Sequence, residues 1–387
     1  MKPLRPIFIA SFLYSFHLAL LMYLNSTVLN LNGNSLETTL AYTLGSMLAI
    51  ALLVASPRLV RRYGNSRFLM GGLIATIIVL WAMGILITTH SFVLLFIVYF
   101  SLYLIVWYGF DLLFEHSSRR RSIGNIRGLV LTLDNTGVML APVVATAMLG
   151  MVGFAGVYFF GALAVIASYL TIRNTPRVAA VDASSHGSMR EAFRALLAHR
   201  SARRIVALYF ILQFFYAWMV VYTPLYLLSL GFSWKTIGIM FSIMLSAFVL
   251  LQYGVGILAD RLHAERAIIM AGCWIAAGAT LALALPLPPD AIIFTAILFA
   301  TRIGASILEV GCESAFFKQV KESDLALIGT LRMTMPMAYI IAPLCGALVL
   351  YIGSPRLLFG ILAGILALGG LYARRLTGFH KSAPFAQ

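Results

Sequence analysis

The chain has 387 residues, of which 61% are hydrophobic and only 11% charged, and its formal net charge is +15. Its apolar residues form runs of about 18 to 24, the length that crosses about 30 Å of hydrocarbon as an α-helix. This composition excludes a chain built around a soluble domain. It predicts an all-α integral membrane protein whose function lies within the membrane.

The apolar runs predict twelve transmembrane helices. The one long polar interruption, 173–204, separates six of them from the other six. We therefore expect an N-terminal six-helix bundle over 1–172, a cytoplasmic linker over 173–204 with a short amphipathic helix at 188–200, and a C-terminal bundle with a short tail over 205–387. In chain order, the predicted spans are 7–29, 38–55, 68–88, 92–114, 128–149, 153–172, 205–229, 234–255, 267–286, 291–313, 326–350 and 356–374.

The basic residues are distributed unevenly between the two sides of this topology. Of the 28 Lys and Arg, only Lys235 and Arg356 fall in loops on one side, and Arg302 and Arg332 fall within spans. The remaining cations share the other side, which the positive-inside rule makes cytoplasmic, together with both termini. The charge thus indicates topology and contact with anionic lipids, and not nucleic-acid binding. We expect a multi-pass protein of the cell membrane, of the bacterial inner-membrane type.

The sequence contains no recognisable set of residues for catalysis. Its three cysteines lie inside apolar runs, without a CxxC pair or a histidine at ligand spacing, so we expect neither a metal site nor a disulfide. It also lacks a Walker A loop, a nucleophile elbow and an HExxH motif. We therefore expect no enzyme activity, no metal and no cofactor, and transport that draws on an existing gradient.

The fifth and eleventh spans repeat each other at an offset of 201 residues. Small residues recur every four positions in both, which lets helix backbones approach closely, and each span contains a proline that removes a backbone hydrogen bond. Two pseudo-symmetric bundles of this kind are typical of transporters with a site near the midplane. The aligned residues are Gly128, Gly137, Ala141, Pro142 and Ala145 in one span and Gly329, Ala338, Ala342, Pro343 and Gly346 in the other.

Residues 256–266, GILADRLHAER, resemble the loop signature of the major facilitator superfamily, G-x-L-A-D-R-x-G-x-x-R, with His263 at the second glycine. The corresponding loop at 57–67, PRLVRRYGNSR, is a degraded copy. The fifth span resembles the signature of the antiporter branch, with small residues at its spacing and Thr146 in place of the last glycine. The resemblance covers the whole chain and implies a secondary transporter, most like the drug or metabolite:proton antiporters.

The same resemblance implies a charged latch at the cytoplasmic ends of the helices, which locks the two halves together. Its expected members are Asp260, Arg261, Arg266, Arg62, Glu115 and Glu313.

Three further acids are candidates for proton coupling. Asp111 and Glu309 each lie four residues before a latch acid, roughly 6 Å deeper by helix rise. They either extend the latch or bind a proton. Asp134 is the only acid well inside the helices of the first half, which makes it the first candidate for the proton carrier.

Arg302 lies deep in the tenth span, on one helical face with Ser306, Glu309 and Glu313. Its guanidinium group should meet either Glu309 or a substrate anion, because an unpaired charge in hydrocarbon is costly. Arg332 aligns three positions from Asp134 in the repeat. These two residues either form a structural salt bridge or act separately, on an anion and on a proton.

Further candidates for substrate binding are polar and aromatic. His17 is central in the first span and is either a hydrogen-bonded packing residue or a proton-exchanging group, since an unperturbed imidazole has a pKa of about 6.5. Aromatic faces with a few polar groups suit amphipathic organic molecules, although core packing explains each ring equally well. The remaining candidates are Asn25, Tyr103, Trp107, Gln213 and Tyr216.

Together these features favour a monomeric transporter that exports a small amphipathic molecule, such as a drug or metabolite, in exchange for protons. Its expected partners are this substrate, protons and membrane lipids. Uptake or exchange of an organic anion is the alternative in the same fold, supported by Arg302 and Arg332. A membrane receptor or scaffold that transports nothing is the alternative of a different class.

Overall fold

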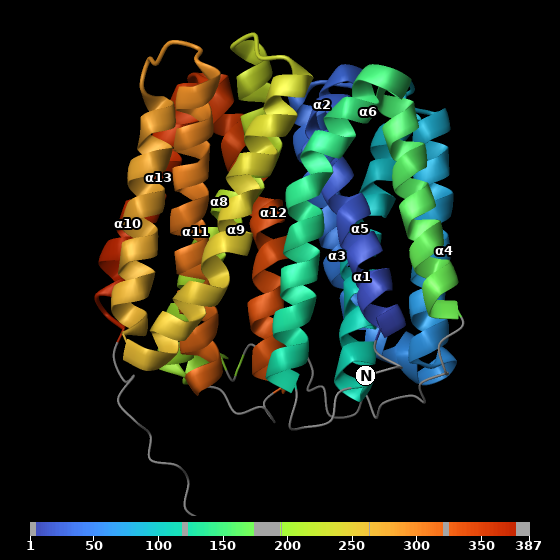
Figure 1. The fold of residues 1–387 in the computed structure, drawn as a ribbon, viewed down its shortest axis with the longest axis horizontal. Helices are drawn as coiled ribbons and strands as arrows, with labels where there is room; N and C mark the ends of the chain where they lie inside the picture. Colours follow the sequence, from blue (N-terminus) through green and yellow to red (C-terminus); the bar gives the residue numbers. More distant parts are fainter. Residues whose placement is uncertain are drawn as a thin grey trace, which may run out of the picture. The chain divides into compact units, whose positions relative to one another are not determined.

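The computed structural model describes residues 5–117, 123–173, 194, 196–262, 264–319 and 325–376. The regular segments within these residues are all helices (Figure 1). They are α1 (Arg5–Met22), α2 (Asn25–Asn32), α3 (Ser35–Tyr63), α4 (Asn65–Ile85), α5 (Ser91–Ser117), α6 (Ile123–Arg173), α8 (Arg200–Ser229), α9 (Trp234–Leu262), α10 (Glu265–Ala284), α11 (Ala291–Gln319), α12 (Leu325–Ile352) and α13 (Pro355–Ala373).

Within the described ranges, eleven helices are long and apolar enough to cross a membrane. One of them, α6, is interrupted at Gly153, whose φ of 66° is a backbone conformation that glycine adopts readily and other residues avoid. Figure 1 shows the chain turning back within α6. The two parts of α6 are the predicted spans 128–149 and 153–172, so the prediction of twelve membrane helices is confirmed.

The prediction of one continuous first span, 7–29, is wrong. The structure divides it into α1, which ends at Met22, and α2, which begins at Asn25. The N–H of Leu24 donates to the carbonyl oxygen of Leu21 at 3.0 Å, the short-range bond of a tightened last turn. The side chain of Asn25 accepts a hydrogen bond from the Tyr158 hydroxyl at 2.7 Å, which anchors the chain just after the break.

The first compact unit consists of α1 to α6 together with Val220–Ser242 and Tyr339–Ala347. Within it, α6 packs along α1 and α4, and α5 packs along α3 and α4 (Figure 1). The small residues of the predicted close-packing seam face inward, because Ala141 and Ala145 are buried and a side chain at Gly137 would meet the Phe12 ring. Packing of α6 against α1 thus uses the seam that the sequence pattern predicted.

Two segments from the second half belong to this unit because they contact first-half helices. The N–H of Val143 donates to the Ser242 hydroxyl at 3.2 Å, and the Thr43 hydroxyl donates to the carbonyl oxygen of Ile340 at 3.3 Å. The compact units therefore do not follow the predicted boundaries, and the division into halves at 173–204 stays a prediction. The predicted amphipathic helix at 188–200 lies mostly outside the described residues.

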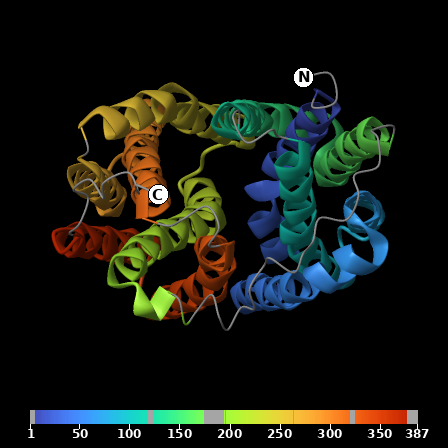
Figure 2. The ribbon, with the colours of Figure 1, turned by 90° about the horizontal axis from the view of Figure 1, so that it is seen from below.

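The second compact unit contains α10, α11 and α13 with parts of α8, α9 and α12. Figure 2, which views the helices end-on, shows α10 beside α11 and α13. The backbones of α10 and α11 nearly touch, since a side chain at Gly272 would lie only 2.5 Å from the backbone nitrogen of Leu308. This contact fixes the rotation of α11 and turns the opposite face, which carries Arg302 and Ser306, away from α10.

Candidate functional site

The second unit buries an arginine against aromatic rings. Arg302 on α11 is only 2% exposed, and its guanidinium carbon lies 5.1 Å from the ring centroid of Phe215 and 5.7 Å from that of Tyr216, both on α8. Stacking on ring faces stabilises a cation in a site without water. The two rings therefore hold the guanidinium group in a defined position.

Two polar groups on this face of α11 have no hydrogen-bond partner among the described residues. They are the Nη1 atom of Arg302 and the hydroxyl of Ser306, one helical turn away. Ser306 is completely buried. A buried donor without an acceptor costs about 1–3 kcal/mol, and more when the donor is charged. Neighbouring donors of this kind form a place where an acceptor group from outside the chain would be stabilised.

The acids on α11 are held by neutral donors. Glu309 accepts hydrogen bonds from the Tyr216 hydroxyl at 3.1 Å and from the Gln252 amide at 3.2 Å. Glu313 accepts one from the Tyr209 hydroxyl at 3.2 Å. Across the part of the chain that the structure describes, Glu309 forms no ion pair with Arg302. Glu309, the internal partner expected for Arg302, thus interacts with it electrostatically but takes its hydrogen bonds from neutral groups.

A second cluster lies in the first unit around Asp134 on α6. This carboxylate is 8% exposed and accepts hydrogen bonds from the Ser11 hydroxyl on α1, at 3.1 Å and 3.4 Å to its two oxygens. Tyr103 interacts electrostatically with both Asp134 and Asp111. In the described ranges, no cationic side chain pairs with Asp134. Among the described side chains, the cluster therefore places a buried acid beside hydroxyl groups and no cation.

His17 has protein partners for both ring nitrogens. Its Nδ1 atom lies 2.5 Å from the carbonyl oxygen of Tyr14, and its Nε2 atom lies 3.3 Å from the Tyr99 hydroxyl. With Nδ1–H donating to the carbonyl group, Nε2 is left as an acceptor for Tyr99. This geometry favours the packing role over the proton-exchanging role, and the role of His17 in substrate binding stays a prediction.

The other substrate-binding candidates are divided between the two units. Asn25, Tyr103 and Trp107 belong to the first unit, where the Trp107 ring lies 6.2 Å from that of Tyr14 in an edge arrangement. Gln213 is buried in α8 in the second unit. The side chain of Arg332 lies outside the described part of the chain. Among the candidates whose side chains are described, Tyr216 is the one that contacts both Arg302 and Glu309.

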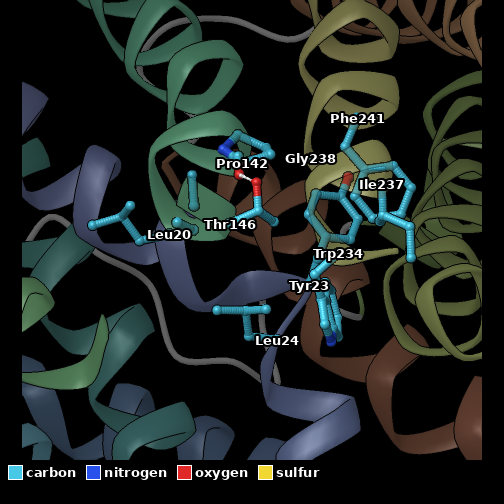
Figure 3. Close-up of a pocket in the computed structure, with 11 residues that line it drawn as sticks. Leu20, Tyr23, Leu24, Pro142, Thr146, Trp234, Ile237, Gly238 and Phe241 are labelled. Carbon is cyan, nitrogen blue, oxygen red and sulfur yellow. Dashed lines mark hydrogen bonds between the residues drawn. The ribbon is translucent and has the colours of Figure 1, made fainter. Parts of the chain in front are cut away.

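A small apolar pocket lies elsewhere in the first unit, between α1, α6 and the start of α9 (Figure 3). Tyr23, Pro142, Thr146, Trp234 and Phe241 are among the residues that line it. None of the predicted site residues contributes to this lining, so we interpret the pocket as a packing gap at the contact between these helices.

Comparison with known proteins identifies the family. The sequence profile described as Major Facilitator Superfamily matches residues 7–322. The chain belongs to the Major Facilitator Superfamily. No curated protein matches the sequence. As a member of this superfamily the chain is a multi-pass membrane protein and a secondary transporter of a small molecule, and not an enzyme.

Solved structures of superfamily members share the fold. The nucleoside transporter NupG superposes with a TM-score of 0.76 at 14% identity, covering 97% of this chain and 99% of that one. A variant of NupG gives a TM-score of 0.77. The human organic anion transporter MFSD10 (TETRAN) gives 0.69 at 15% identity, covering 96% of this chain and 98% of that one. At this identity the likeness establishes the fold alone.

The loop signature of the superfamily forms an ion pair that the sequence reasoning missed. Lys318, near the end of α11, contacts Glu265 at 2.5 Å and donates to the carbonyl oxygen of Ala259 at 3.4 Å. Glu265 is only 1% exposed. The pair ties the ends of α9, α10 and α11 together. An acid at the first position of a helix, where the helix dipole favours negative charge, was the available signal.

The structure describes the side chains of three of the six residues predicted for the latch. Arg62 is exposed and lies over the ring of its neighbour Tyr63 at 5.4 Å, and Arg266 is exposed as well. Glu313 is bonded to Tyr209. The side chains of Glu115, Asp260 and Arg261 lie outside the described part of the chain. The latch therefore stays a prediction, and Glu265 and Lys318 join its candidates.

Proposed function

We propose that this superfamily member exports a small amphipathic organic molecule, such as a drug or metabolite, in exchange for protons. Asp134 carries the proposal. It is buried on α6, is bonded to the Ser11 hydroxyl, and has no cationic partner among the described side chains. A charged carboxylate in such surroundings costs several kcal/mol, and a bound proton removes that charge.

In this proposal the proton serves as the counter-charge of Asp134, since no described cationic side chain pairs with it. Alternating access requires a site whose occupancy differs between the two facing states, and a carboxyl group that gains or loses solvent contact meets this requirement. Asp111 and Tyr103 interact electrostatically with each other and with Asp134, so in this proposal they pass the proton onward. Glu309, bonded to Tyr216 and Gln252, is the second candidate carrier.

The antiporter assignment is supported by the fifth span. Pro142 interrupts the hydrogen-bond ladder of α6, and the Thr146 hydroxyl donates to the carbonyl oxygen of Pro142 at 2.9 Å. Thr146 thus has a local role at the position where the antiporter signature has glycine. Small residues at Gly137, Ala141 and Ala145 retain the close packing of that signature.

We further propose a monomer in a bacterial inner membrane, with both termini in the cytoplasm. The distribution of basic residues between the two sets of loops supports this orientation. In this arrangement, the halves 1–172 and 205–387 move about the linker 173–204.

Flux in proteoliposomes tests the proposal. Amphipathic compounds are added one at a time to proteoliposomes with an imposed pH gradient. The accumulation of each compound is followed for the wild type and for Asp134→Asn. We expect the wild type to concentrate at least one compound against its gradient, and Asp134→Asn to equilibrate it without concentrating it. Asp290→Asn is the matched control. Asp290 caps the exposed start of α11 through the N–H of Ile292, and asparagine caps equally well. Accumulation by Asp134→Asn equal to that of the control would refute the proposal.

Uptake or exchange of an organic anion is the second candidate, favoured by the buried Arg302. The side of the membrane on which the substrate accumulates under a pH gradient distinguishes export from uptake. An exporter concentrates its substrate on the acidic side of the membrane, whereas an anion importer coupled to protons concentrates it on the alkaline side.

A further inference from the structure

We infer that the substrate carries a carboxylate group and that Arg302 and Ser306 on α11 bind it. This inference rests on the proposed transport function, whose substrate class it narrows from amphipathic molecules in general to organic acids with an apolar body.

The first observation is that both groups are buried and have no partner. Arg302 is 2% exposed and Ser306 is 0% exposed, yet Nη1 of Arg302 and the hydroxyl of Ser306 make no hydrogen bond among the described residues. They are one helical turn apart, so their donors point to the same side of α11. A chain that leaves a charged donor and a neutral donor unsatisfied side by side provides a site for an acceptor with a negative charge.

The second observation is that the nearest acid is held by other donors. Tyr216 and Gln252 both donate to Glu309, at 3.1 Å and 3.2 Å. In the same unit, the buried carboxylate of Glu265 does pair directly with a cation, Lys318, at 2.5 Å. Arg302 and Glu309 interact electrostatically, but no direct ion pair joins them among the described residues.

The third observation concerns the rings that hold the arginine. Phe215 and Tyr216 lie against the guanidinium group, at 5.1 Å and 5.7 Å. They hold the guanidinium carbon in place, and the Nη1 atom, which lacks a partner among the described residues, is available for a charge-assisted hydrogen bond to a carboxylate. The rings also form an apolar wall beside that contact, which suits the hydrocarbon or aromatic part of an organic acid.

Charge sets the class of the anion. One guanidinium group neutralises one negative charge, and the hydroxyl of Ser306 adds a donor without adding a charge. A carboxylate matches this set, whereas a doubly charged phosphate would keep an uncompensated charge in a buried site. The same arrangement disfavours organic cations, because they would meet the positive charge of Arg302 directly.

Equilibrium binding to the purified full-length protein tests the inference. The probes are two matched pairs, benzoate with benzamide and 4-phenylbutanoate with 4-phenylbutanamide, because each pair differs in charge and little else. Calorimetry and the quenching of tryptophan fluorescence report binding. We expect at least one carboxylate to bind the wild type about tenfold or more tightly than its amide, as one charge-assisted hydrogen bond suffices for that ratio.

Variants of Arg302 and Ser306 test whether these residues cause the preference for carboxylates. Arg302→Gln should abolish the preference for the carboxylate, and Arg302→Lys should keep a part of it, because the charge remains without the planar guanidinium group. Ser306→Ala should weaken carboxylate binding several-fold and change amide binding little. Arg356→Gln, at an exposed position in the same unit, should behave as the wild type.

Two results would overturn the inference: no carboxylate preference for either pair in the wild type, or an unchanged preference in Arg302→Gln that elutes as a folded protein. Failure of this inference is separable from failure of the proposed function. Carboxylates that bind through Arg302 but are not concentrated by a pH gradient would refute proton-coupled transport alone. Proton-driven accumulation of compounds without any carboxylate preference would refute the inference alone.

Discussion

The contact between α10 and α11 should tolerate no side chain at Gly272. A methyl group there would lie 2.5 Å from the nitrogen and 2.8 Å from the α-carbon of Leu308, both backbone atoms that cannot rotate away. The helices would have to separate, and overpacking of this kind costs about 1–3 kcal/mol. Alanine recovers about 0.5–1 kcal/mol through its higher helix propensity. We therefore expect Gly272→Ala to be destabilised by about 1–2 kcal/mol.

Gly278→Ala on the same helix is the matched control, because no atom lies within 4 Å of the position that its methyl group would occupy. The assay is the half-life of monodisperse protein in detergent at a fixed elevated temperature, which measures kinetic stability. A change of about 1.4 kcal/mol in the unfolding barrier alters this half-life tenfold. The half-life of Gly272→Ala should therefore be about tenfold shorter than that of the wild type. The half-life of Gly278→Ala should equal or exceed that of the wild type. Equal half-lives for the two variants would refute the backbone contact.

Three further substitutions test separate parts of the structure. Lys318→Met leaves the carboxylate of Glu265 buried and unpaired and should cost about 2 kcal/mol, less than the usual 3–5 because the Lys318 side chain is 36% exposed. The double variant Lys318→Met/Glu265→Gln should recover most of this loss in the same assay, and a double variant as unstable as the single one would contradict the pairing. His17→Phe keeps a ring but loses both hydrogen bonds and should lower stability by about 1–3 kcal/mol without ending proton-driven flux. Loss of flux at unchanged stability would instead give His17 a transport role. Gly153→Ala should destabilise the turn within α6 by about 1–2 kcal/mol, because its φ is 66°, and a half-life equal to that of the wild type would contradict this conformation.

The helices were predictable because hydrophobic length is a local property of the sequence. Most predicted spans begin and end within a few residues of the observed helices, although α3, α9 and α11 extend further, to Tyr63, Leu262 and Gln319. The break before Asn25 was missed, because it depends on the contact with Tyr158, which lies 133 residues away in the sequence.

The candidate site was predictable only in part, for the same reason. Arg302 and Asp134 stand out in the sequence because a charge inside an apolar run is costly. Their partners carry no such signal. Ser11 lies 123 residues from Asp134, and Gln252 lies 57 residues from Glu309. Phe215 is one aromatic residue among many in an apolar helix. Only the packing of α8 against α11 distinguishes it as the ring beneath Arg302.

The most direct test of proton coupling through Asp134 is to drive proton movement with a substrate gradient. A substrate gradient is imposed across proteoliposomes without a pH gradient, and a trapped pH-sensitive dye follows proton movement. If Asp134 carries the proton, the wild type moves protons against the direction of substrate flow, and Asp134→Asn lets the substrate equilibrate without moving protons. Proton movement by Asp134→Asn at the rate of the wild type would contradict proton coupling through Asp134.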